Sequence, residues 1–125
     1  MPPHVNRALI VDDEPDVAEM FAVVFQQSGY EVRVVHSAQA ALEAAGSEEF
    51  HVVMSDIGMP GMSGYELAAA LRAMPNFRRV TLIAVTGFSV YDDRNRSQRA
   101  GFNHHLVKPV LMQKFIQLIN ELKNK

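Results

Sequence analysis

Acidic, basic and hydroxyl side chains stand at the ends of short apolar runs that lie far apart in this chain. Asp12 and Asp13 follow the first run, Asp56 ends the third, and Thr86 and Lys108 follow the fourth and fifth. Carboxylates crowded together repel one another unless a cation neutralises them, and hard oxygen ligands suit Mg²⁺ or Mn²⁺. An ammonium and a hydroxyl suit the oxygens of a transferring phosphoryl group. If the five residues meet, the chemistry they predict is metal-assisted phosphoryl transfer.

Asp56 is the carboxylate best suited to be the reacting group. It ends an apolar run that is followed by Gly and Pro, a pattern typical of a buried strand. In α/β sheets, ligands bind just outside the carboxyl ends of the strands. Asp and Glu side chains can act as nucleophiles and form acyl phosphates. Because a single acid in a turn is ordinary, the prediction depends on the elements that position the other four residues.

Five apolar runs alternate with five amphipathic segments. Strands are expected at 7–11, 30–35, 52–56, 80–85 and 102–107, and helices at about 14–28, 37–45, 63–74, 89–99 and 111–122. The alternation predicts an α/β fold, a doubly wound (βα)5 parallel five-stranded sheet with order 2-1-3-4-5 and helices on both faces. In that order the ends of strands one, three, four and five adjoin, so the five residues should converge.

Residues at the helix ends predict where the first three helices start and stop. Asp13 can cap the first helix with Pro15 in its first turn, and Gly29 is expected as its left-handed stop. Ser63 and Glu66 match a capping box.

The fourth and fifth helices differ in their anchoring. Residues 89–92 match a second capping box, but residues 93–99 are polar almost all round, so we expect this helix to be the least well anchored. The last helix should present an apolar stripe to the sheet, formed by Leu111, Phe115, Leu118, Ile119 and Leu122.

Length and composition favour one domain, residues 1–125, in a reducing compartment. The chain has no cysteine, no signal-peptide pattern and no apolar run long enough to span a membrane, so we expect a soluble cytoplasmic protein without membrane contact. Residues 1–66 carry eleven acids and two bases, and residues 67–125 carry ten bases and three acids. Since the bases are spread over several elements, we interpret them as a solvated surface and expect no nucleic-acid contact.

Each site residue also has an ordinary structural interpretation. Asp13 could serve only as a helix cap, Thr86 only as a strand residue, and Lys108 only as a surface base or ion-pair partner. Their joint placement at strand ends argues against coincidence.

Four motifs together resemble the signatures of response-regulator receiver domains of two-component signalling systems. They are Ile10–Glu14, Asp56–Gly64, Thr86–Gly87 and Lys108–Pro109, and the resemblance covers essentially the whole chain. It implies a flavodoxin-like fold and a cis Lys108–Pro109 bond. The sequence around the last two motifs looks most like receivers of hybrid histidine kinases, and the chain could be either a stand-alone receiver or a domain of such a longer kinase.

The resemblance also implies the role of each residue. Asp56 would accept a phosphoryl group from a phosphohistidine on a histidine kinase or a histidine phosphotransfer protein. Mg²⁺ would be held by Asp13, Asp56 and the backbone carbonyl of Gly58, with Asp12 acting through water. Lys108 would pair with the phosphoryl group, and Thr86 would turn toward it as a switch. Such a domain catalyses its own phosphorylation and dephosphorylation, and is a monomer or a weak phosphorylation-dependent dimer.

Three positions bear on how the switch would work. His105 stands where receivers carry an aromatic switch residue, so the standard coupling to the threonine is in question and a pH-sensitive rotamer is one hypothesis. His104 and His105 should point to opposite faces of a strand, which argues against joint metal chelation. Gly58 and Phe88 resemble positions that tune the lifetime of the acyl phosphate.

Two other functions fit parts of the pattern. A Mg²⁺-dependent phosphohydrolase with an aspartyl nucleophile commonly carries a second acid two residues later, where this chain has Gly58. A flavodoxin-like cofactor binder would need a phosphate-cradling loop after the first strand, where Asp12, Asp13 and Glu14 would instead repel a phosphate.

Overall fold

A parallel five-stranded sheet forms the centre of the molecule. The computed structural model describes residues 5–87 and 91–123. The strands are β1 Arg7–Val11, β2 Glu31–Val35, β3 Val52–Asp56, β4 Thr81–Thr86 and β5 His104–Val107. All pairings are parallel and the order is β2-β1-β3-β4-β5, which confirms the predicted fold class and places β2 at one edge of the sheet.

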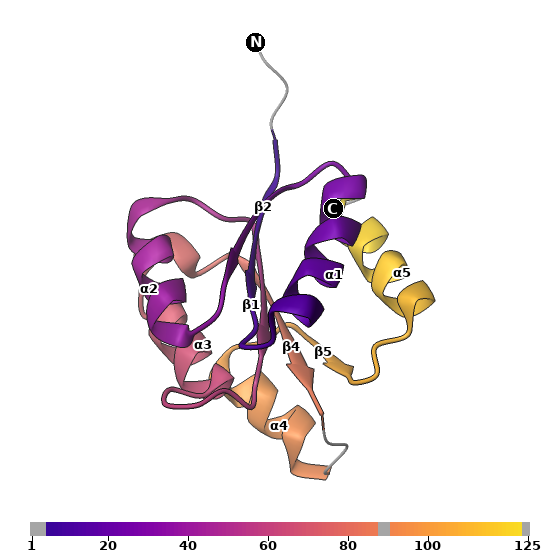
Figure 1. The fold of residues 1–125 in the computed structure, drawn as a ribbon. Coiled ribbons are helices and arrows are strands. Elements are labelled where there is room, and N and C mark those ends of the chain that lie inside the picture. Colours follow the sequence, from indigo (N-terminus) through magenta and orange to yellow (C-terminus); the bar gives the residue numbers. More distant parts are fainter. Residues whose placement is uncertain (1–4, 88–90, 124–125) are drawn as a thin grey trace.

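Helices cover both faces of this sheet. They are α1 Pro15–Gln27, α2 Ala38–Ser47, α3 Gly64–Arg72, α4 Tyr91–Ala100 and α5 Met112–Lys123, with a 3-10 turn η1 at Pro75–Phe77. Helices α1 and α5 lie together on one face, and α2, α3 and α4 lie on the other (Figure 1). None of the helices in the described part of the chain is long and apolar enough to cross a membrane.

Alternating side chains of the strands divide the core into two layers. The layer under α1 and α5 is formed chiefly by Ile10, Met54, Ile83, Phe21, Phe25, Phe115 and Ile119. The layer under α2 and α3 is formed chiefly by Leu9, Val11, Val53, Leu82, Ala84, Ala41, Leu67 and Leu71. Central strands buried on both faces are apolar nearly throughout, which explains why the strand ends stand out as the polar positions.

The first helix does not begin as predicted. Its cap residue is Glu14, which makes no side-chain cap hydrogen bond, so the prediction that Asp13 caps the helix is wrong. The physical reason is that the first helical hydrogen bond runs from the Ala18 N–H to the Glu14 carbonyl at 3.0 Å, so the helix starts one residue later and Glu14 stands at the cap position. The other end is as expected, because Gly29 adopts a φ of +96°.

Other helix ends agree with the sequence more closely. The Ser63 and Glu66 capping box is present at the start of α3. Leu111, in contrast, is 60% exposed and does not belong to the apolar stripe of α5. It precedes the first turn, where its carbonyl accepts the Phe115 N–H, so its side chain does not face the sheet. The predicted cap at Ser89 lies outside the described residues, as does Phe88.

Candidate functional site

Three carboxylates meet at the carboxyl-terminal edge of the sheet. Asp12 and Asp13 follow β1, Asp56 ends β3, and one ligand oxygen from each lies within 4.8 Å of the others. The strands β1 and β3 are neighbours, so the fold brings together residues more than forty positions apart. Three hard oxygen donors at this spacing form a donor set that fits a small divalent cation such as Mg²⁺.

Lys108 supplies a positive charge at the same place. Its Nζ lies 3.6 Å from Asp12 Oδ2 and 3.7 Å from Asp56 Oδ2. The Lys108 backbone N–H donates to the Thr86 carbonyl at 2.7 Å, so β4 holds the segment that carries this lysine. Thr86 itself is buried at the end of β4, beside β3. The peptide bond between Lys108 and Pro109 is cis, as the resemblance implied.

Burial shapes the electrostatics of the two inner carboxylates. Desolvation raises the pKa of the Asp56 carboxyl, and the nearby Lys108 ammonium offsets only part of that rise. Desolvation also raises the pKa of Asp12, against the opposing effects of the Glu14 backbone N–H and Lys108. Both carboxylates are therefore held in an environment that disfavours negative charge, which a bound cation would relieve.

The raised pKa of Asp12 predicts a pH-dependent stability difference. When the pKa of a carboxyl is higher in the folded than in the unfolded state, the folded state binds the proton more tightly. The stability associated with that proton is fully present below the ordinary pKa and is lost as pH rises through the raised pKa. An Asp12→Asn variant is neutral at every pH. Without divalent cations, we expect it to be more stable than the parent protein near pH 7, with the difference shrinking toward acid pH. Urea unfolding of both proteins across that range measures this, and a difference that grew toward acid pH would contradict it.

Backbone contacts position Asp56 at the end of β3. The Ser55 hydroxyl donates to the Asp56 carbonyl at 2.9 Å, and the Gly58 N–H donates to Asp56 Oδ1 at 3.3 Å. Gly64, the first residue of α3, lies so close that a Cβ there would be 2.5 Å from the Asp56 carbonyl oxygen. The strand end and the helix start therefore touch backbone to backbone, and only glycine fits between them.

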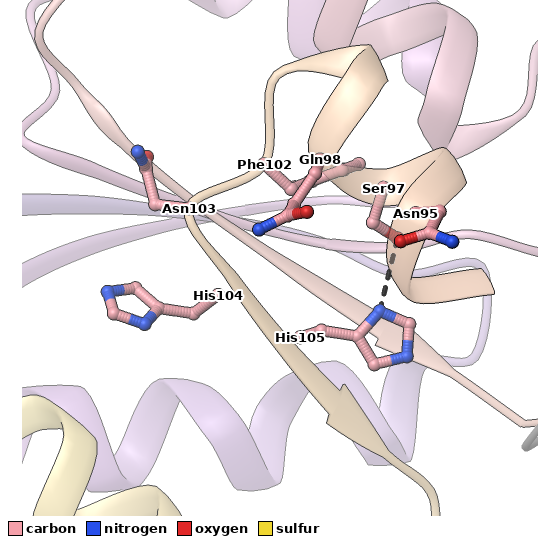
Figure 2. Close-up of a pocket in the computed structure, with 7 residues that line it drawn as sticks. All are labelled: Asn95, Ser97, Gln98, Phe102, Asn103, His104 and His105. Atoms are coloured by element: carbon pink, nitrogen blue, oxygen red, sulfur yellow. Dashed lines mark hydrogen bonds between the residues drawn. The ribbon is translucent and has the colours of Figure 1, made fainter. Parts of the chain in front are cut away.

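His105 lies against α4. It pairs with Ala84 in the sheet, and its Nδ1 lies 3.1 Å from Ser97 Oγ, in a hydrogen bond that Figure 2 shows. The rings of His104 and His105 leave β5 on opposite sides, as the sequence predicted. A cavity of about 360 Å³ lies beside them; it is lined by Asn95, Ser97, Gln98, Phe102, Asn103, His104 and His105.

Polar contacts hold α4 to its neighbours. Ser97 is buried, whereas the side chains of Asn95, Arg96, Gln98 and Arg99 are exposed. The Arg96 guanidinium stacks 4.3 Å from the centre of the Tyr65 ring on α3. A cation–π contact and a hydrogen bond are modest interactions, so these two described contacts of α4 are each individually weak. The expectation that α4 is the least well anchored helix stays a prediction.

The sequence analysis did not predict two hydrogen-bond contacts at and near the site, those of His36 and Ser97. The strand order carries a signal for His36, because it places the residue after β2 beside the residue after β1. The His36 ring does contact the Asp12 carbonyl, with Nδ1 3.0 Å from the oxygen. Ser97 carried no comparable signal, because the whole helix around it is polar.

Comparisons with known proteins agree with this geometry. Residues 8–120 match the family model of the response regulator receiver domain. The chain is 34% identical over 113 residues to an uncharacterized 14.6 kDa protein of Leptolyngbya boryana, covering 90% of this chain and 86% of that protein. It is 30% identical over 114 residues to the polar-differentiation response regulator DivK of Brucella ovis, covering 91% and 93%.

Some relatives are much longer than this chain. The sensor histidine kinase GacS of Pseudomonas protegens is 29% identical over 116 residues, but the match covers 90% of this chain and only 13% of that kinase. What such a long protein does as a whole is therefore not transferable from the match.

Solved structures show the same fold. The chemotaxis response regulator CheY4 of Vibrio cholerae superposes with a TM-score of 0.88 at 25% identity, covering 95% of this chain and 99% of that one. The receiver domain of the sensor histidine kinase PA1611 of Pseudomonas aeruginosa, which has a magnesium ion coordinated in its active site cleft, gives a TM-score of 0.86 at 25% identity, covering 98% and 100%. On the match to the family model and to these relatives, the chain belongs to the response regulator receiver domain family.

Proposed function

We propose that Asp56 accepts a phosphoryl group from a phosphohistidine on a histidine kinase or a histidine phosphotransfer protein. One observation carries the proposal: a buried carboxylate lies 3.7 Å from the Lys108 ammonium, inside a cluster of three acids that fits a divalent cation. A lone acid would lack the charges needed to hold a phosphoryl group beside it. The chain as a whole, residues 1–125, would act as one such receiver unit.

The transfer is a direct displacement at phosphorus. An ionised Asp56 oxygen forms the new P–O bond while the P–N bond of the donor breaks. The electron pair of the P–N bond goes to the imidazole nitrogen, which leaves as neutral imidazole when the donor ring carries a proton on its other nitrogen. Lys108 is placed to balance the charge on the phosphoryl oxygens, which is the main task of a protein in phosphoryl transfer.

The acids around Asp56 provide a site for Mg²⁺ or Mn²⁺. Asp13, Asp56 and the Gly58 carbonyl would hold the ion directly, and Asp12 would contribute through water. When bound, the ion supplies positive charge that neutralises the cluster and attracts the incoming phosphoryl oxygens. The Gly58 N–H donates to Asp56 Oδ1, so this residue lies beside the carboxylate that would share the ion with its carbonyl.

We propose that the signal leaves the site through Thr86 and α4. Thr86 adjoins the acids, and the chain runs on from it toward α4, which is held by the Ser97–His105 hydrogen bond and by the Arg96 stack. A helix held by polar contacts of this kind can change its population of states when a phosphoryl group draws Thr86 inward. The Ser97 hydroxyl can either donate to Nδ1 or accept from it, so protonation of His105 need not break this contact.

The composition of the chain bears on its compartment, and Gly58 bears on the alternative function. A chain without cysteine suits the reducing cytoplasm, which is the compartment we propose. The hydrolase alternative remains the less supported one, because Gly58 offers no second acid for turnover.

Incubation with acetyl phosphate and Mg²⁺ tests the proposal without a cognate kinase. We expect the intact mass to rise by one phosphoryl group, with the label lost in acid or base and absent when a chelator removes the metal. Catalytic turnover of p-nitrophenyl phosphate would instead support the hydrolase. A label that forms equally well without a divalent cation would contradict the proposed site.

A further inference from the structure

Asp12 is held through all of its polar atoms. Its backbone N–H donates to the Val35 carbonyl at 3.2 Å, and its carbonyl contacts His36 Nδ1 at 3.0 Å. Its Oδ1 accepts the Glu14 N–H at 2.9 Å, and its Oδ2 lies 3.6 Å from Lys108 Nζ. The two peptide units that flank the Asp12 Cα are thus both tied to the end of β2, the preceding one by a hydrogen bond to the Val35 carbonyl and the following one by the His36 side chain.

Asp13 presents the opposite situation. Its side chain is exposed, and no hydrogen bond or ion pair joins its carboxylate to any residue in the described ranges. Yet one of its oxygens lies within 4.8 Å of the ligand oxygens of Asp12 and Asp56. Because the Asp13 carboxylate has no such partner in the described ranges, its position depends on the backbone of its own residue. That backbone begins with the peptide unit whose carbonyl His36 contacts.

We propose that His36 is a positioning residue for the metal site. Its ring N–H donates to the Asp12 carbonyl and fixes the plane of the peptide between Asp12 and Asp13, so that the Asp13 carboxylate is presented to a divalent cation. A carbonyl oxygen can only accept a hydrogen bond, so Nδ1 must carry the hydrogen. This inference rests on the proposed function, since it assigns a support to the same metal site.

The placement of His36 argues for this role over a purely structural one. The residue is exposed at an edge of the sheet, outside both apolar layers, so its ring contributes little to the core. Groups that hold the ligands of a metal commonly change metal affinity when they are removed, even though they do not touch the ion. His36 contacts the peptide carbonyl that precedes Asp13 and not the Asp13 carboxylate itself, so the expected change in metal affinity is smaller.

Mg²⁺ titration of the whole chain, followed by isothermal calorimetry, tests the role of His36. An Asn side chain places its amide N–H close to the position of Nδ1, whereas Ala has no donor. We expect His36→Ala to weaken the affinity for Mg²⁺ about 3- to 10-fold, and His36→Asn to remain within about 2-fold of the parent. His104→Ala, on the opposite edge strand, serves as the control and should bind Mg²⁺ as the parent does.

A second readout reports the hydrogen bond itself. Nitrogen-15 correlation spectra of the parent should show His36 with its hydrogen on Nδ1. The proposal is overturned if His36→Ala binds Mg²⁺ as tightly as the parent, or if Ala and Asn weaken binding equally. If the parent binds no Mg²⁺ at all, the proposed metal site fails as well; if the parent binds and the variants match it, only the role of His36 fails.

Discussion

An Asp56→Asn variant should take up no phosphoryl group, either from acetyl phosphate or from a phosphohistidine donor. The amide nitrogen carries no negative charge and cannot form the acyl phosphate, so the labelling rate should fall by at least about 100-fold. The amide has almost the shape of the carboxyl group. Because burial raises the pKa of Asp56, removing its charge should leave the fold at least as stable as the parent near neutral pH. Intact-mass measurement after timed incubation gives the rate, and urea unfolding gives the stability.

The control for this variant is another acid changed to its amide. Glu43 lies exposed on α2, so Glu43→Gln should be labelled as the parent is. If Asp56→Asn kept the label, the phosphoacceptor would have to be another carboxylate of the cluster, and peptide mapping would distinguish Asp12 from Asp13. If Asp56→Asn lost both the label and the fold, the expectation that removal of the Asp56 charge leaves the fold stable would be wrong, and with it the raised pKa of Asp56.

The sequence was sufficient to predict the fold because its strands are buried on both faces. Apolar runs such as Val52–Met54 contrast sharply with the polar residues at their ends, so the strands and their order could be predicted. Helix boundaries were less predictable where neighbouring residues are all polar. Asp13 and Glu14 both precede Pro15, and nothing in their order indicates that the first helical hydrogen bond will go to the Glu14 carbonyl.

The site was predictable as a set of strand ends, but its supports were not. The convergence of the three acids with Lys108 follows from topology alone. The contact between His36 and the Asp12 carbonyl depends on the direction of one side chain and one peptide plane. Periodicity does not encode such directions. The hydrogen bond between Ser97 and His105 could not be predicted for the same reason, although His105 itself was predicted to stand at the switch position.

Gly64→Ala should disturb both the fold and the reaction, because the backbone of α3 touches the strand end that carries Asp56. A Cβ at this position would lie 2.5 Å from the Asp56 carbonyl oxygen and 2.9 Å from the Ile57 Cα. These atoms belong to the backbone, so they cannot rotate away as a flexible side chain can. Alanine favours a helix interior over glycine by up to about 1 kcal/mol, but Gly64 begins its helix, where that gain is smaller. The overlap should therefore dominate and lower the free energy of unfolding by about 1–3 kcal/mol.

The effect on labelling should exceed the effect on stability. Relief of the overlap must move either α3 or the end of β3, and a displacement near 1 Å at the reacting group can cost up to about 100-fold in rate. We expect folded Gly64→Ala to be labelled about 10- to 100-fold more slowly than the parent. Gly46→Ala is the matched control, since a Cβ there meets nothing within 4 Å; it should be slightly more stable than the parent and be labelled normally. Normal labelling of Gly64→Ala at normal stability would mean that the strand end and α3 can separate freely. The position of Asp56 would then not depend on the close approach of Gly64.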